Sequence, residues 1–219
     1  HPREEVIGLM HRRIGPYPIS AIDFVSAFDV GANKVGRPLF EAVYASPNLV
    51  KWLTLPRRGN KVKVLEAPIA DGVGIYVANK IKPVKRPTKL PVLRERIIEE
   101  IRRTHTEILV NYLPVGSQKA TEFWAGIALE AGCAFINCIP VFIASNPSWG
   151  RRFSERKIPI IGDDVKGQIG ATIVHRLLAW LANVRGAKID RTYQLNVGGN
   201  TDFLNMKEDE QTAQEQQDL

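Results

Sequence analysis

Two acids and a lysine in residues 162–172 form the segment of this chain best suited to chemistry on an anion. Asp163, Asp164 and Lys166 stand where a helix is expected to begin. An aspartate at a helix start caps free backbone N–H groups, and the same helix end favours a phosphate or an oxyanion. In a buried, partly cationic pocket the lysine pKa falls, so its amine can move protons or stabilise an enolate. Taken alone, the segment favours a capped surface helix with a solvated lysine over a reactive site.

A second polar segment follows the last expected strand, residues 189–197. Asn200 and Asp202 lie there, behind Gly198 and Gly199, which free the backbone. Open α/β sheets bind ligands at the carboxyl ends of their strands, so these side chains suit a hydroxyl-rich ligand. The same residue types also build ordinary turns.

Further candidates stand at the ends of earlier strands. Asp29 ends the expected strand 22–30, where dinucleotide-binding domains carry the acid that binds a ribose. Residues 111–117 form a strand end, a turn and a helix start, which an ordinary βα turn also explains. Asn137 is polar at the end of an apolar strand, as either a hydrogen-bonded core residue or a pocket group.

The elements that must position these residues alternate along the chain. Hydrophobic periodicity predicts strands at 22–30, 62–65, 107–113, 134–139, 158–161 and 189–197, and helices at 34–45, 92–103, 117–131, 149–156 and 166–184. Such alternation predicts one parallel sheet with helices on both faces and with its strand ends at one edge. The last helix is expected to bury Ile169, Ile173, Val174, Leu177, Leu178 and Leu181.

One part of the dinucleotide pattern is missing. The sequence has no G-x-G-x-x-G turn and no strand before residues 22–30. In a doubly wound sheet the first strand lies beside the second and the fourth, so its absence is expected to leave unpaired strand edges. The predicted fold class is therefore α/β, a Rossmann-like doubly wound parallel sheet that lacks its first strand and Gly-rich loop. It spans residues 1–206, and residues 207–219 form a polar acidic tail.

Composition limits the other possibilities. The chain has 219 residues and a formal charge of +7, although its tail is acidic, which favours anionic partners. Cys133 and Cys138 form no CxxC pair, and no apolar run is long enough to span a membrane. These features predict a cytoplasmic protein without a membrane partner. The basic residues of 80–96 lack interleaved aromatics, so we expect a solvated loop and no nucleic acid.

Several ordered motifs resemble the inositol-1-phosphate synthases (myo-inositol-3-phosphate synthases) of prokaryotic type. They are residues 8–11, 15–17, 24–30, 111–117, 135–145, 162–172, 190–192 and 194–206. The resemblance implies an NAD-dependent isomerase (an intramolecular lyase) of inositol and phospholipid biosynthesis. It would convert glucose 6-phosphate into an inositol phosphate by oxidation, aldol closure and reduction. It implies no metal site.

The resemblance also implies roles for single residues. Lys166 would transfer protons and stabilise oxyanion charge, oriented by Asp164, with Asn200 as a further catalytic residue. The implied cofactor-binding residues are Asp29, Pro114, Ser117, Asn137, Asp163, Gly167 and Asp202.

Nothing in the chain matches the homo-oligomerisation region and the later lysines of the family. We therefore expect little turnover from the isolated chain. Two alternatives stay open. One is a non-catalytic, nucleotide-binding remnant of the family, and the other is a basic nucleic-acid-binding module.

Overall fold

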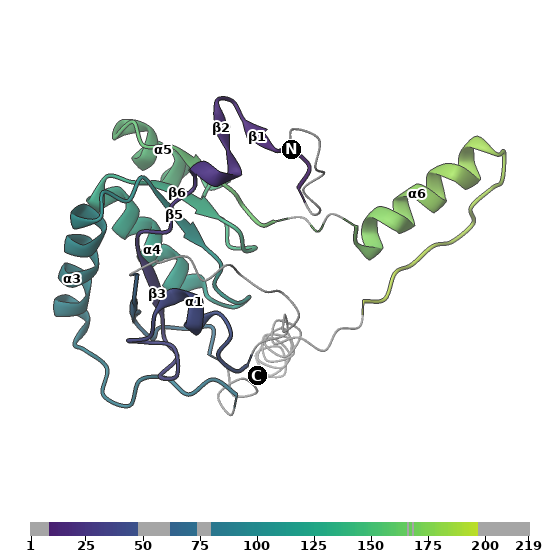
Figure 1. Cartoon of the computed structure of the whole chain (residues 1–219). Coiled ribbons are helices and arrows are strands. Elements are labelled where there is room, and N and C mark those ends of the chain that lie inside the picture. The colour runs from purple at the N-terminus through teal and green to yellow at the C-terminus, as the bar shows by residue number, and fades with distance from the viewer. Residues whose placement is uncertain (1–8, 48–61, 74–79, 166, 168, 197–219) are drawn as a thin grey trace, which may run out of the picture.

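The computed structural model describes residues 9–47, 62–73, 80–165, 167 and 169–196. The first elements are a small antiparallel hairpin of β1 (Arg13–Ile14) and β2 (Tyr17–Pro18), followed by the 3-10 helix η1 (Ile19–Ala21). A turn with Gly15 at φ 58° joins the two strands, a backbone angle that suits glycine. This hairpin lies apart from the strands that build the sheets (Figure 1).

The remaining strands are all parallel. β3 (Ala27–Asp29) pairs with β4 (Val64–Glu66), and β5 (Ile108–Asn111), β6 (Ala134–Asn137) and β7 (Ile160–Ile161) form a three-stranded sheet in that order. Helices α3 (Leu90–Arg103), α4 (Gln118–Ala131) and α5 (Pro147–Glu155) separate successive strands from β4 to β7. The parallel α/β fold class predicted from the sequence is confirmed.

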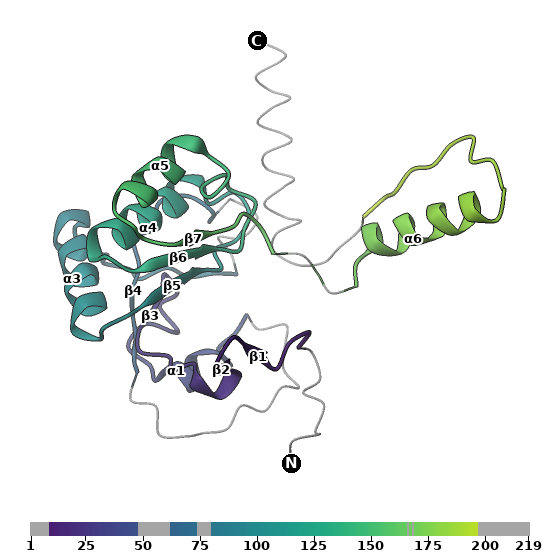
Figure 2. The ribbon, with the colours of Figure 1, turned by 90° about the horizontal axis from the view of Figure 1, so that it is seen from above.

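The single predicted sheet is divided into two sheets between β3 and β5. Neither strand has a strand partner on its second edge within the described residues. Figure 2 shows the β3–β4 pair beside β5, on the side away from β6. In a doubly wound sheet the first strand lies between the second and the fourth, so β3, β4 and β5 take the places of strands two, three and four. This division matches the unpaired edges expected from the sequence.

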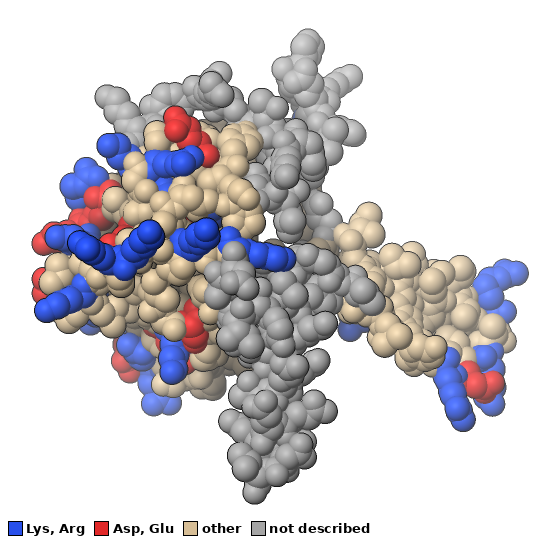
Figure 3. Space-filling view, turned by 90° about the horizontal axis from the view of Figure 1, so that it is seen from below, with Lys and Arg blue, Asp and Glu red and all other residues tan. Residues whose placement is uncertain are grey.

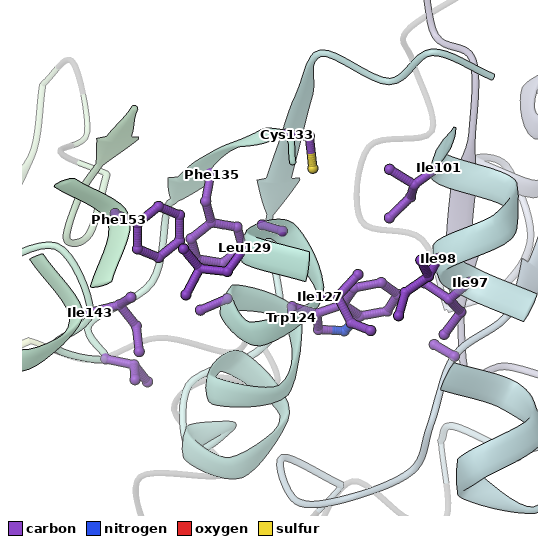
Figure 4. Packing of buried hydrophobic residues seen from close by; sticks show 14 of the residues in the cluster. Ile97, Ile98, Ile101, Trp124, Ile127, Leu129, Cys133, Phe135, Ile143 and Phe153 are labelled. Carbon is purple, nitrogen blue, oxygen red and sulfur yellow. The ribbon is translucent and has the colours of Figure 1, made fainter. Parts of the chain in front are cut away.

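The core lies between the three helices and one face of the strands (Figure 4). Helix α3 buries residues that recur on one side of the helix, and α4 is the most buried helix. The Phe28 ring packs at 5.0 Å from Trp124 of α4, which joins the β3–β4 pair to the main core. Fully buried side chains of the cluster include Ile97, Ile101, Ile127, Phe135, Ile143 and Phe153.

Local signals explain where the helices begin and end. The Asn146 side chain accepts a hydrogen bond from the Ser148 backbone N–H at 2.9 Å, and Pro147 follows at the first position of α5. Helix α4 ends at Gly132, whose φ of 85° is the left-handed conformation typical of helix C-termini. The short α1 (Leu39–Ala42) occupies only part of the helix predicted over 34–45, because residues 32–36 form turns.

The prediction for the last helix was wrong in two respects. Helix α6 (Ala171–Val184) begins at Gly170, so Asp163 and Asp164 do not cap it. Its predicted inner face is also exposed, with Leu177 and Leu178 each 59% accessible. The reason is tertiary, because α6 projects away from the body and packs against no core formed by the described residues (Figures 1 and 2).

The strand predicted over 189–197 is also absent from its described part. Residues 187–196 have no regular secondary structure. They run back along α6, where the His175 ring contacts the side chains of Thr192 and Gln194. Without a neighbouring strand, this segment has no ladder partner to make it a strand.

Candidate functional site

Several of the described candidate residues lie where β5, β6 and β7 end. Pro114 and Ser117 lie in the turn between β5 and α4, Asn137 ends β6, and Asp163 follows β7. Carboxyl ends of parallel strands share one edge of a sheet, which is why residues far apart in sequence meet here. Lys166, Asn200 and Asp202 lie outside the described residues.

A buried pair of asparagines connects the ends of β5 and β6. Asn111 and Asn137 are 4% and 1% exposed, and the Asn111 Nδ2 donates to Asn137 Oδ1 at 2.9 Å. The same Nδ2 reaches Thr121 Oγ1 at 3.2 Å, and the Thr121 hydroxyl donates to the Ser117 carbonyl at 2.6 Å. Asn137 is therefore a hydrogen-bonded core residue, one of the two possibilities that its sequence position left open.

The Asn137 side chain extends this network to the loops after β6 and β7. Its Nδ2 donates to the carbonyls of Ile139 and Val141 at 3.1 and 2.6 Å, and to Asp163 Oδ1 at 2.8 Å. A continuous path of polar contacts thus runs from Ser117 to Asp163 across the edge of the sheet.

Asp163 is the most heavily hydrogen-bonded acid of the described residues. Besides Asn137, its carboxylate accepts from the backbone N–H groups of residues 143, 144 and 145 at 2.9–3.0 Å, and from the Ser145 hydroxyl at 2.6 Å. Burial raises the pKa of this carboxyl, but the hydrogen bonds from Asn137, Ser145 and Ala144 together hold the pKa below its usual value.

The next residue faces a different environment. Asp164 is exposed and has a φ of 68°, which is unusual for a residue other than glycine. Within the described residues, its Oδ1 accepts a hydrogen bond from the neighbouring Val165 N–H at 2.9 Å. A Cβ on Gly167 would meet no described atom within 4 Å. Asp164 thus differs from Asp163 in being exposed.

Asp29 holds the equivalent position on the other sheet, at the end of β3. Its Oδ1 accepts from the Gly31 N–H at 2.7 Å, and its Oδ2 lies 2.8 Å from the Lys34 ammonium. The carboxylate side chain is 29% exposed. A carboxylate has about four lone-pair positions, so Asp29 can still accept a hydrogen bond from a hydroxyl.

The start of α4 contains a group that the sequence did not reveal. Asp71 caps this helix from the loop after β4, its oxygens accepting from the N–H groups of Lys119 and Ala120 at 2.6 and 2.9 Å. Ser117 is the N-cap residue of this helix, but its side chain makes no capping bond. The Asp71-Gly72 pair, a frequent turn signal, was the only sequence indication of this role.

The Ser117 hydroxyl is a buried oxygen without a hydrogen-bond partner among the described residues. The residue is 1% exposed, and a Cβ on Gly72 would lie 1.9 Å from its Oγ. An unpaired polar atom and a close glycine backbone, beside a strand-turn-helix junction, fit a site that takes a hydrogen-bonding ligand.

The parallel sheet and the helices between its strands define a Rossmann-like α/β domain with a polar edge where the strands end. None of the described helices is long and apolar enough to cross a bilayer.

Known proteins similar to this chain agree on one family. A sequence model described as Myo-inositol-1-phosphate synthase matches residues 170–217. A protein of Corynebacterium glutamicum named inositol-3-phosphate synthase is 48% identical over 206 residues, which cover 94% of this chain and 54% of that relative. The protein of that name from Mycobacterium tuberculosis is 47% identical over 205 residues, with the same two coverages.

A solved structure supports the fold as well. The crystal structure of Ari2 matches with a TM-score of 0.75 and 35% identity, over 93% of this chain and 57% of that one. Over nearly its whole length the chain is thus similar to inositol-3-phosphate synthases. It spans about half the length of the curated relatives it matches.

Proposed function

We propose that this chain forms part of an NAD-dependent inositol-3-phosphate synthase, an isomerase of the intramolecular lyase class. Its substrate would be glucose 6-phosphate and its product an inositol phosphate for phospholipid biosynthesis in the cytoplasm. The observation that carries the proposal is the 48% identity to a named synthase over 94% of the chain. The polar edge of the sheet supports it, because a sugar phosphate and a dinucleotide both need convergent hydrogen-bonding groups.

The described residues fit NAD as the cofactor. Asp29 retains acceptor capacity for the hydroxyls of the adenosine ribose, and the turn of Pro114 and Ser117 offers an unpaired buried hydroxyl beside a close glycine backbone. Bound NAD would supply reversible hydride removal and return. Gly167 and Asp202 complete the proposed cofactor set. Asn137 and Asp163 would support this set through the hydrogen bonds described above.

The proton chemistry would fall to residues of the 162–172 segment. Lys166 would transfer the proton on the carbon next to the new carbonyl. Its ammonium form would also stabilise the oxyanion, because a positive charge there attracts the developing negative charge. Asp164, which is exposed, would orient Lys166. Asn200 would hold the substrate hydroxyls.

The test uses a chimera, because the chain spans half of its relatives. Residues 1–219 replace the matching segment of the Corynebacterium glutamicum relative. Product is measured as phosphate released after periodate treatment of a reaction with NAD and glucose 6-phosphate. We expect turnover by the chimera, and a loss of at least about 10²-fold in the Lys166→Ala variant, because removing one oxyanion donor costs about that much.

A matched lysine provides the control. Lys188 is an exposed lysine paired with the exposed Asp190, so Lys188→Ala should leave turnover unchanged. A folded chimera that binds NADH but makes no product would favour the non-catalytic remnant instead. Full activity in the Lys166→Ala variant would contradict the proposed role of Lys166.

A further inference from the structure

The hydrogen bonds of Asp163 leave no room for a ligand on its carboxylate. An ionised carboxylate accepts about four hydrogen bonds. Three backbone N–H groups, the Ser145 hydroxyl and the Asn137 amide already donate to its two oxygens, all within 3.0 Å. A ligand donor could bind Asp163 only by displacing one of these groups.

The same contacts hold three separate segments together. Asn137 ends β6, residues 143–145 lie in the loop before α5, and Asp163 is in the turn after β7. Successive N–H groups pointing at one anion form a concave anion site, and here a side chain of the same chain fills it. The bonds therefore fix the turn of residues 162–165 against the loop of residues 143–145.

Close packing restricts the turn from its other side. A Cβ on Gly162 would lie 3.0 Å from both the Cβ and the carbonyl oxygen of Asn137. The turn backbone therefore lies directly on the end of β6. The backbone N–H of Asp164 adds a further tie, donating to the Ile139 carbonyl at 3.1 Å.

We propose that Asp163 is a positioning residue that serves as the internal anion of the 143–145 loop, and thereby fixes the turn that presents Asp164. The two adjacent aspartates then have different tasks, since one is enclosed by donors and the other is exposed. A catalytic role for the fixed turn rests on the proposed function. The anchoring of the loop by Asp163 is independent of that function.

The anchoring contact is tested on the 219-residue chain without any ligand. Amide exchange is measured at residues 143–145 in Asp163→Asn and in the control Asp23→Asn, which changes an exposed aspartate. We expect exchange at these amides to rise about ten-fold or more in Asp163→Asn only, because an NH2 donor replaces one acceptor oxygen and the negative charge is lost. Unchanged protection in Asp163→Asn would overturn the proposal.

The positioning role is tested in the chimera with Asp163→Asn and Gly162→Ala. The second variant keeps both carboxylates but pushes the turn away from Asn137. Each variant is assayed at the same interval below its own Tm, so that lost stability does not mimic lost catalysis. We expect turnover to fall about ten-fold or more in both, with KM for glucose 6-phosphate within about two-fold, because a displaced turn costs rate rather than binding.

The outcomes separate the two proposals. If the unsubstituted chimera makes no product, the proposed function fails, and amide exchange in the isolated chain alone decides whether Asp163 holds the loop. If Asp163→Asn loses NADH affinity while its 143–145 amides stay protected, Asp163 is a cofactor ligand and the inference is wrong. If Gly162→Ala keeps full turnover, the position of the turn does not control the rate and the inference is again wrong.

Discussion

Replacing Asn137 with alanine tests the buried network that joins the ends of the strands. The side chain is 1% exposed and contacts four polar groups, namely the Asn111 amide, the Ile139 and Val141 carbonyls, and Asp163. Alanine supplies none of these contacts, and the site is too enclosed for water to replace all of them. The substitution therefore leaves buried groups without partners.

The expected cost follows from the number of groups left unpaired. Each buried polar group that loses its partner costs about 1–3 kcal/mol. Asn111 keeps a second acceptor in Thr121, and Asp163 keeps four donors. The Ile139 carbonyl also keeps two backbone N–H donors, so the Val141 carbonyl carries most of the loss. We expect the free energy of unfolding to fall by about 2 kcal/mol, and Tm to fall by about 4–8 °C for a chain of this size.

The assay is urea unfolding followed by tryptophan fluorescence, since Trp124 lies in the core. The matched control is Asn183→Ala on the exposed surface of α6, where we expect a change within about 0.5 kcal/mol. A double-mutant cycle with Asp163→Ala should give a coupling of about 0.5–3 kcal/mol, because the two side chains share a hydrogen bond. A loss below about 1 kcal/mol in Asn137→Ala would refute the reasoning, because the network would then contribute no more than a surface contact.

Three further predictions concern other parts of the molecule. Gly72→Ala should destabilise the chain by about 2 kcal/mol, because φ is +79° there and the new Cβ meets Ser117 Oγ. Adding Ser117→Ala should recover part of the loss, and Gly126→Ala, in open space within α4, should be neutral or stabilise by up to about 1 kcal/mol in thermal melts. The difference in unfolding free energy between the wild type and Asp163→Asn should be largest above pH 4 and shrink as pH falls further. The reason is that the folded-state pKa of Asp163 lies below its unfolded value of about 3.9. Urea unfolding at several pH values would contradict this if the difference grew in acid. Leu177→Gln on α6 should shift stability by about 0.5 kcal/mol or less, whereas Leu129→Gln in the core should cost about 3 kcal/mol or more; equal losses in calorimetry would mean that α6 is packed in solution.

The exposed surface of α6 marks a limit of sequence-based prediction. Figure 3 shows the projecting segment with mostly uncharged side chains along its length and charged ones at its far end. Its periodicity correctly predicted a helix, because local spacing determines which residues share a face. Periodicity contains no information about what covers that face, so the predicted burial failed.

The sequence by itself determined the alternation of strands and helices, the parallel class and the positions of α3, α4 and β6. These features follow from the local hydrophobic period, which acts over a few residues. Sequence also singled out Asn137 and Asp163, because polar residues at the ends of apolar strands are conspicuous.

Only the tertiary structure decided what those residues do. Asp71 caps a helix 48 residues away, and Asp163 accepts hydrogen bonds from residues 18–20 positions before it. Such partners are brought together by the order of strands in the sheet, which no local pattern encodes. Two adjacent aspartates look alike in the sequence, and the fold alone encloses Asp163 while it leaves Asp164 exposed.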